Sequence, residues 1–333
     1  MLLGFDIGGT KCAIVLGAND GTGSPASPGQ LDIIGKTRLD TDRPVYDMIA
    51  ALFTEAEALL ARHNISIEAL TGIGISCGGP LSSKKGLILS PPNLIGWDNI
   101  PIVDMATKRF VGKPVLLQND ANACAVAEWK YGAGRGTDNL IFLTFGTGMG
   151  AGLILNGRLY SGPADLAGEV GHIRLAGMGP VGFGKAGSFE GYCSGGGIAQ
   201  LGQIKARERI QVGGTVSYCK SLEDLPAVTA RTIAEAALRG DKTAQEVYEL
   251  SAEYLGRAIA MFVDLLNPEL IILGSIYGRA KQLIDPKMHE VIKREAYHGS
   301  LENFRIEPAG LSENIGDMAA LSLAVMAGHE QLV

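Results

Sequence analysis

Two copies of one short glycine-rich pattern constrain this 333-residue chain more than any other feature. The first copy runs from Leu3 to Leu16, as two apolar strands around Asp6-Ile7-Gly8-Gly9-Thr10-Lys11. The second runs from Leu140 to Leu155 around Thr144-Phe145-Gly146-Thr147-Gly148-Met149-Gly150. We expect both copies to form β-hairpins whose tight turns need glycine, because only glycine reaches positive φ without steric cost.

The two turns indicate a binding function. Backbone N–H groups of a glycine turn can converge on an anion, so two such hairpins can hold one polyphosphate from two sides. For a single hairpin an ordinary turn is the better explanation, since short glycine motifs are weak signals. The repetition, with threonine in both turns and Asp6 and Lys11 flanking the first, favours phosphate binding. Asp6 can also hold Mg²⁺ through water, whereas Lys11 is either a phosphate contact or a solvated strand residue.

Length and charge exclude several classes of protein. A chain of 333 residues exceeds what one hydrophobic core usually serves, so we expect two domains. The net charge of -6 gives no basic footprint for nucleic acid. The five cysteines are scattered and favour reduced thiols in a cytoplasmic protein. No basic region or long apolar stretch precedes Asp6, so we expect no signal peptide. The most apolar helix candidate, Leu255 to Leu266, carries Arg257 and Asp264, so we expect a core helix and not a membrane span.

The order of predicted elements indicates an α/β fold. The first half reads β-β-β-α-β-α-β-α, which predicts a mixed sheet flanked by helices, and the second half repeats hairpin, helices, strand and helix. Asp317 is well placed to cap the last helix. Besides the hairpins, we expect strands at 31–39, 72–76, 114–117, 270–273 and 304–307, and helices at 46–63, 101–110, 194–208, 227–239, 243–266, 281–297 and 317–327. A further helix is expected to follow the segment 118–122 and to end at residue 131.

Asn119 and Asp120 lie directly after an apolar strand and before a helix. Ligands collect at the carboxyl ends of strands in open α/β sheets, and an Asp there can be a general base. The alternative is that Asn119 or Asp120 only caps the following helix, which these residue types do well. The local sequence does not separate these two functions.

The segment from Ser161 to Tyr192 is glycine-rich and has almost no periodicity. Loops this long inside a compact domain are usually functional. Its Glu169, His172 and Glu190 can bind a polyhydroxylated ligand through charge-assisted hydrogen bonds. The alternative is a solvated loop with incidental charges. A zinc site at His172 is a further option, but no cysteine or other histidine lies within fifteen residues on either side.

Together these residues resemble the ROK family of repressors and bacterial sugar kinases, over nearly the whole chain. Asp6 to Lys11 resembles the first phosphate motif of the family, Thr144 to Gly150 the second, and Leu273-Gly274-Ser275 the adenosine motif. Asn119 to Asn122 matches the catalytic segment, and Gly168 to His172 matches the family signature. The resemblance implies two actin-like (ribonuclease-H-like) ATPase domains, each with a mixed sheet flanked by helices, and a cleft between them.

The resemblance also implies roles for individual residues. Asp120 becomes the catalytic base that takes the proton from the primary hydroxyl of the sugar. ATP and Mg²⁺ become the cofactors. The substrate-binding residues are Gly78, Gly79, Asn93, Asn119, Glu169, His172 and Glu190, and the cofactor-binding residues are Asp6, Gly8, Gly9, Thr10, Lys11, Thr144, Gly146, Thr147, Gly148 and Gly274. The implied domains are 1–117, completed by a C-terminal helix at 317–333, and 118–316, in a homodimer.

The chain departs from the family at the zinc site. Many members bind zinc through the signature histidine and a Cys-x-Cys-Gly-x-x-Gly-Cys run, and Val181, Phe183 and Ser188 occupy the three cysteine positions here. We therefore predict no zinc. Packing around Phe183 and Phe189 is expected to hold the loop in place of the metal. A nitrogen of His172 that zinc would occupy is then free to contact sugar.

The sequence thus predicts an ATP-dependent hexokinase-type sugar kinase acting on the 6-hydroxyl of glucose, with N-acetylmannosamine, N-acetylglucosamine, fructose and allose as open alternatives. A non-catalytic sugar-sensing protein is the alternative from another class. The repressors of the family carry a helix-turn-helix domain before the first phosphate motif. Here that motif begins at residue 6 and the chain is acidic, so we expect no nucleic-acid partner and no membrane partner.

Overall fold

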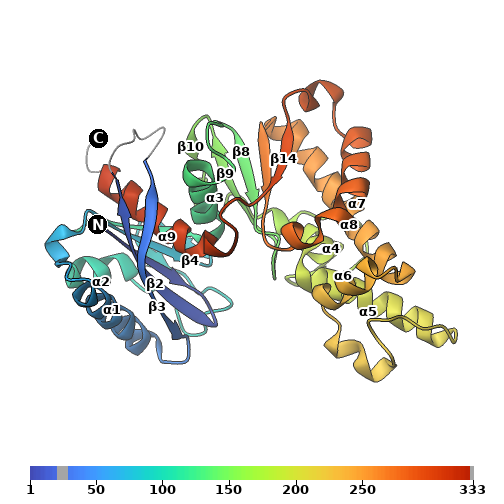
Figure 1. Ribbon diagram of the computed structural model, residues 1–333, viewed down its shortest axis with the longest axis horizontal. Coiled ribbons are helices and arrows are strands. Elements are labelled where there is room, and N and C mark those ends of the chain that lie inside the picture. The colour runs from blue at the N-terminus through green and yellow to red at the C-terminus, as the bar shows by residue number, and fades with distance from the viewer. Residues whose placement is uncertain (21–28, 331–333) are drawn as a thin grey trace. The chain divides into compact units, whose positions relative to one another are not determined.

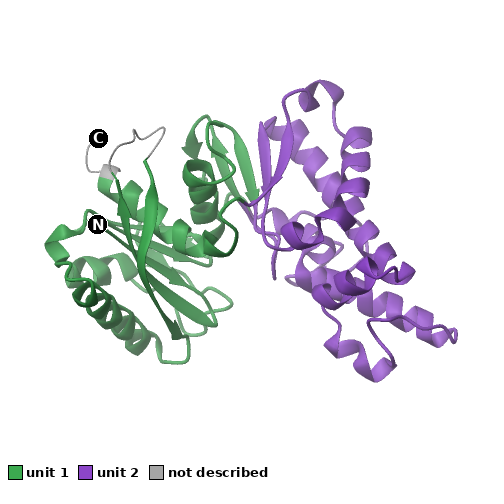
Figure 2. Cartoon of the chain, viewed as in Figure 1, with its two compact units in different colours: residues 1–142, 152–168, 310–333 green, residues 143–151, 169–309 purple. Residues whose placement is uncertain are grey.

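A computed structural model describes residues 1–20 and 29–330 of the chain. The chain divides into two compact units, which Figure 2 colours separately. Unit 1 comprises residues 1–142, 152–168 and 310–333, and unit 2 comprises residues 143–151 and 169–309. The expected domain boundary between residues 117 and 118 stays a prediction, and residues 331–333 of its C-terminal helix lie outside the described part of the chain.

Unit 1 is built on a mixed sheet with the strand order β3-β2-β1-β4-β7. The first predicted hairpin is confirmed, because β1 and β2 pair antiparallel, with Ile7 opposite Cys12. β4 pairs parallel with β1, and β7 pairs parallel with β4. The strands span Leu2–Ile7 (β1), Lys11–Asn19 (β2), Leu31–Asp40 (β3), Gly72–Cys77 (β4) and Val115–Asn119 (β7).

Helices cover both faces of this sheet (Figure 1). Side chains alternate along a strand, so Leu3 and Phe5 join the core against one set of helices while Leu2 joins the core on the other face. On the first face, Phe53 and Phe110 stack edge to face at 5.6 Å between ring centroids. The first set is α1 (Val45–Arg62) and α2 (Ile102–Arg109), and the second is α3 (Asp120–Tyr131) and α9 (Ile315–Glu330).

The helix α9 approaches the sheet closely because the strands beneath it carry glycine. A Cβ added to Gly74 would lie 2.0 Å from the carbonyl oxygen of Ala320. The predicted cap of this helix is wrong: α9 begins at Ile315, so Asp317 lies inside its first turn. The Asp317 carboxylate instead forms an ion pair with Lys36 of β3. The side chain of Asp317, which the local sequence predicted to cap α9, thus pairs with a residue of another element.

The second predicted hairpin is also present. β8 and β9 are hydrogen-bonded neighbours, and β10 pairs antiparallel with β9. Two short strands, β5 and β6, pair antiparallel in unit 1. These elements span Leu140–Leu143 (β8), Ala151–Leu155 (β9), Arg158–Leu159 (β10), Leu81–Ser82 (β5) and Leu87–Ile88 (β6).

Unit 2 consists mainly of helices, with β13 and β14 paired in parallel. The helix predicted to begin near Lys281 is the part of α8 that follows a break at the non-helical Ala280, and the prediction missed the part before this break, which begins at Ile276. No helix within the described residues is long and apolar enough to cross a membrane. The elements span Val181–Gly182 (β11), Lys185–Ala186 (β12), Phe189–Cys193 (α4), Gly195–Gln211 (α5), Ala230–Leu238 (α6), Lys242–Leu266 (α7), Leu270–Leu273 (β13), Ile276–Glu295 (α8) and Arg305–Pro308 (β14).

The close approach of α9 predicts a stability effect. Gly74→Ala should lower the free energy of unfolding by about 1–3 kcal/mol, because the new methyl group meets backbone atoms that cannot rotate away. Gly278→Ala is the control, since its Cβ would meet no atom within 4 Å. Urea unfolding of both variants measures the effect, and an equal stability of the two variants would show that α9 can shift without cost.

Candidate functional site

The carboxyl ends of three neighbouring parallel strands bring the predicted site residues of unit 1 together. Ile7, Cys77 and Asn119 lie in one register across β1, β4 and β7. The chain leaves these strands at Gly8, Gly78 and Asp120, so all three exits share one edge of the sheet. Gly79 lies at this edge too, where an added Cβ would be 3.0 Å from Nδ2 of Asn119. This edge is where open α/β sheets collect their ligands.

The first glycine turn is closed by backbone bonds, as predicted, but its glycines serve another purpose. The Gly8 N–H donates to the carbonyl oxygen of Lys11 at 3.2 Å, and the Thr41 N–H donates to that of Thr10 at 2.9 Å. Neither Gly8 nor Gly9 has a positive φ, so that reason for glycine is wrong. A Cβ on Gly9 would lie 2.2 Å from the carbonyl oxygen of Asn93. Glycine is needed here because another segment passes close by.

The structure assigns the capping function to Asn119. Its side chain accepts a hydrogen bond from the Ala121 N–H at 2.9 Å, and α3 begins at the next residue. The Asp120 carboxylate also accepts from the Ala121 N–H, at 2.8 Å, and its side chain reaches solvent. Asn119 therefore caps α3 through its side-chain oxygen. Asp120 is left as an accessible carboxylate at the start of a helix.

Charge in this region is concentrated on carboxyl groups. Burial and, to a smaller extent, the neighbouring carboxylates of Asp120 and Asp317 together raise the pKa of Asp6 to about 6, against the opposing effect of Lys36. The pKa of Asp120 is raised as well, because the surrounding protein displaces water from this carboxyl even though part of the side chain is exposed. The hydrogen bond from the Ala121 N–H opposes this effect. Asp6 and Asp120 therefore lie within electrostatic reach of each other.

A pocket of about 260 Å³ opens beside the first turn. Its lining includes the predicted residues Asp6 and Lys11 and two cations that the sequence analysis missed, Lys36 and Arg38. Both lie on β3, two residues apart, so they project from the same face of the strand. Strand alternation around the predicted strand 31–39 could have indicated that pair. It could not have indicated that β3 lies beside the turn.

The second glycine turn belongs to unit 2 and is closed more tightly than the first. The Thr144 N–H donates to the carbonyl oxygen of Gly150 at 3.0 Å, and the Gly150 N–H donates to the side-chain oxygen of Thr144 at 2.9 Å. The carbonyl oxygen of Gly146 accepts from the Gly195 N–H at 2.7 Å. Gly274 follows β13 and donates to Leu143 at 3.0 Å, directly before the turn. The predicted adenosine motif and the second predicted phosphate motif are therefore neighbours.

Glu190 connects the irregular segment to this turn. Its carboxylate accepts from the Met149 N–H at 3.0 Å, and a Cβ on Gly148 would lie 2.9 Å from the same oxygen. Gly148 and Met149 thus lie on the part of the turn that Glu190 contacts. Ser188 caps α4 by accepting from Gly191 at 3.1 Å, which fixes the start of the helix that carries Glu190.

Glu169 precedes a short 3₁₀ turn, Val170–His172, which ends at His172 and packs on the same region. Gly171 lies against the turn, since its Cβ would be 2.2 Å from the carbonyl oxygen of Met149 and 3.3 Å from the Glu190 Cβ. The Glu169 carboxylate lies 4.0 Å from Nε2 of His172. Both side chains are about half exposed, at 54% and 44%, so a ligand in solvent can reach them.

Metal ligands are sparse in both units. Within residues 1–20 and 29–330, no group of three or more His, Cys, Asp and Glu side chains is placed to hold a metal ion. The absence of zinc remains a prediction. Mg²⁺ has a different requirement, because it keeps several waters and binds few carboxylates. Asp6 fits that requirement, because it is a carboxylate that lines a pocket, and a cation there would offset its burial and the repulsion from Asp120 and Asp317, which together raise its pKa.

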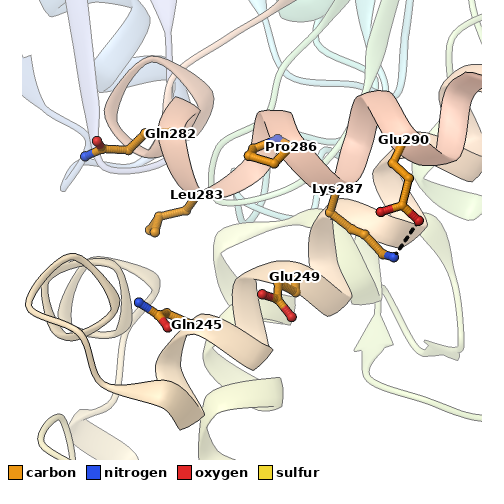
Figure 3. Close-up of a pocket in the computed structure, with 7 residues that line it drawn as sticks. All are labelled: Gln245, Glu249, Gln282, Leu283, Pro286, Lys287 and Glu290. Atoms are coloured by element: carbon orange, nitrogen blue, oxygen red, sulfur yellow. Dashed lines mark hydrogen bonds and ion pairs between the residues drawn. The ribbon is translucent and has the colours of Figure 1, made fainter.

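A second pocket, of about 380 Å³, lies between α7 and α8 (Figure 3). It is mostly polar, with Lys287 paired to Glu290 at 2.9 Å. None of the predicted site residues is among the side chains that line it, which are Gln245, Glu249, Gln282, Leu283, Pro286, Lys287 and Glu290. It is therefore separate from the clusters described above.

Comparison with known proteins identifies the family. The model of the ROK family matches residues 2–327 of the chain. The chain belongs to the ROK family. This ROK protein is 29% identical over 325 residues to a glucokinase of Thermotoga maritima, covering 97% of the chain and 96% of that relative. It is 28% identical to the DNA-binding transcriptional repressor Mlc of Escherichia coli, over 86% of the chain and 67% of Mlc.

Solved structures give the same fold. A ROK glucokinase from Streptomyces griseus, in complex with glucose and AMPPNP, superposes with a TM-score of 0.73 at 27% identity, covering 98% of the chain and 99% of that protein. The mixed sheets flanked by helices and this match confirm the predicted actin-like fold of ROK kinases. Relatives of this ROK protein thus include both sugar kinases and repressors.

The raised pKa of Asp6 predicts a pH-dependent effect on stability. Its value in the folded protein, about 6, exceeds the ordinary 3.8, so the free energy of unfolding falls as pH rises from about 4 to about 6, by at most about 3 kcal/mol. Asp6→Asn should therefore be more stable than the unmodified protein at pH 7.5 and equally stable at pH 4.

Urea unfolding at the two pH values, in magnesium-free buffer, measures this difference. Asp32→Asn, an exposed residue of β3, is the matched control and should change stability little at either pH. A loss of stability in Asp6→Asn at pH 7.5 would show that ionised Asp6 is stabilised by its surroundings.

Proposed function

We propose that this ROK protein transfers the γ-phosphoryl group of ATP to the 6-hydroxyl of a hexose, with glucose as the first choice. The observation that carries the proposal is the position of Asp120. Its carboxylate lies at the sheet edge from which the first glycine turn emerges, within electrostatic reach of Asp6. A base for a hydroxyl group and a turn for phosphate therefore lie at one edge of unit 1.

In the proposed reaction, Asp120 accepts the proton of the sugar 6-hydroxyl as that oxygen bonds to the γ-phosphorus and ADP leaves. Its raised pKa suits this role, because a carboxylate with a higher pKa is a stronger base. Bound ATP and Mg²⁺ supply the phosphoryl group and neutralise its charge. Asp6 would hold the hydrated cation, and the backbone of Gly8 to Thr10 with the Lys11 side chain would contact phosphate.

The proposed sugar contacts are polar groups of both units. In unit 1 they are Asn93, Asn119 and the backbone of Gly78 and Gly79. In unit 2 they are Glu169, His172 and Glu190. Glu190 uses one carboxylate oxygen for the Met149 N–H, which leaves the other to accept from a sugar hydroxyl. Thr144, Gly146, Thr147, Gly148 and Gly274 would contact the nucleotide.

A kinase is favoured over a non-catalytic sugar sensor because Asp120 and both glycine turns are present. The names of glucokinase relatives support the same choice. A panel of hexoses and N-acetylhexosamines with ATP, followed by coupled ADP release, separates the two functions. Steady ADP production with any sugar excludes the sensor, whereas sugar binding without turnover supports it.

The proposal includes no zinc, so elemental analysis that found one zinc per chain would contradict that part.

The base predicts the behaviour of one substitution. Asp120→Asn should abolish turnover while sugar affinity stays within about tenfold, because the amide keeps the shape of the side chain but cannot accept the proton. Coupled ADP release gives the turnover, and calorimetric titration of the sugar gives the affinity.

Asp104→Asn is the matched control, because Asp104 is an exposed Asp in the first turn of α2 in the same unit. It should keep normal turnover. Near-normal turnover in Asp120→Asn would overturn the assignment of the base, even if the protein proves to be a kinase.

A further inference from the structure

We propose that the hairpin of β11 and β12, with Phe183 in its turn, is a positioning element that holds His172 and Glu190 in place for sugar. The inference rests on the proposed function, since it concerns the same substrate. It assigns a purpose to Phe183, a residue that contacts neither of the glycine turns in the contacts described above. All of the contacts involved lie within unit 2.

The hairpin contacts His172 at two points. The rings of Phe183 and His172 lie edge to face, with centroids 5.2 Å apart and an angle of 80° between their planes. The Lys185 ammonium group donates a hydrogen bond to the carbonyl oxygen of His172 at 2.7 Å. One contact fixes the imidazole ring and the other fixes the backbone that carries it, so together they limit how the imidazole can turn.

The same hairpin contacts the segment that carries Glu190. A Cβ on Gly182 would lie 2.7 Å from the Cβ of Glu190 and 2.6 Å from the backbone nitrogen of Gly191. Gly182 therefore lets the hairpin lie directly against the start of α4. Two proposed sugar ligands, 18 positions apart in the sequence, are thus contacted by neighbouring residues of one hairpin.

Phe183 is an unusual residue for its position. It has a φ of +43°, in the left-handed region that a bulky side chain seldom occupies, and its side chain is 66% exposed. Burial therefore gives little compensation for the unfavourable backbone conformation. Glycine would adopt this backbone conformation without steric cost, but it would not provide the contact that the Phe183 ring makes with the His172 ring.

Val181 offers a matched control on the same hairpin. It is also apolar and partly exposed, at 46%, and it has a negative φ. Its backbone N–H and carbonyl group both bond to the Gln200 side chain, and these bonds survive a change of side chain. Val181→Ala therefore removes apolar surface from the hairpin without removing an aromatic ring.

The test compares substitutions at the two positions. Phe183→Leu should raise the KM for the best sugar of the panel about three- to tenfold, while kcat and the KM for ATP change less than twofold. Phe183→Tyr, which keeps the ring, should restore the sugar KM. Val181→Ala should leave all three constants unchanged. A sugar KM that is unchanged in Phe183→Leu, or raised equally in Val181→Ala, overturns the proposal.

A second measurement does not depend on activity. The imidazole signals of His172 in a ¹H–¹³C NMR spectrum, assigned through His172→Gln, should shift in Phe183→Leu and stay in place in Val181→Ala, because an aromatic ring changes the field at its neighbour. An unshifted His172 signal in Phe183→Leu overturns the proposal. No turnover on the whole sugar panel by the unmodified protein contradicts the proposed function instead, so the two failures are distinguishable.

Discussion

The parallel register of β1, β4 and β7 is the constraint on which the candidate site of unit 1 depends. Parallel strands that end in register release their chains at one edge, and here the chain leaves at Gly8, Gly78 and Asp120. Three segments that are distant in sequence therefore meet because of the strand register alone, and they need no direct contact with one another to do so. A shift of one residue in this register would turn each strand over and move its side chains to the opposite face of the sheet.

In unit 2 a single carboxylate makes the corresponding connection. Glu190 bonds to the Met149 N–H, and so joins the irregular segment to the second glycine turn. The glycines around Glu190 are needed because there is no room for a larger side chain. A Cβ on Gly148 would meet the Glu190 side chain, and a Cβ on Gly171 would meet the carbonyl group of Met149. Close approach of another segment, and not a left-handed backbone, therefore accounts for the glycine at these two positions. The same reason applies to Gly9 beside Asn93.

The position of Asp6 in unit 1 reduces the stability of the folded protein when this carboxyl is ionised. Burial and the neighbouring carboxylates of Asp120 and Asp317 raise the pKa of Asp6 to about 6, so ionising this carboxyl costs more free energy in the folded protein than in the unfolded chain. One of these charges is compensated, because Asp317 pairs with Lys36. The unfavourable placement of Asp6 is what a site prepared for a cation would require, and proteins accept such local costs where binding needs them.

The sequence by itself determined the hairpins, the order of elements, the helix cap near Asn119 and the family, because apolar periodicity, turn residues and capping residues act within a few positions of one another. It could not determine why glycine occupies the turns, that Lys36 takes Asp317 from a capping role, that Lys36 and Arg38 line a pocket beside Asp6, or that Phe183 packs on His172. Each of these depends on segments that approach one another only after strand register and packing are fixed. Tertiary structure therefore decided the contacts, while local sequence decided the elements that make them.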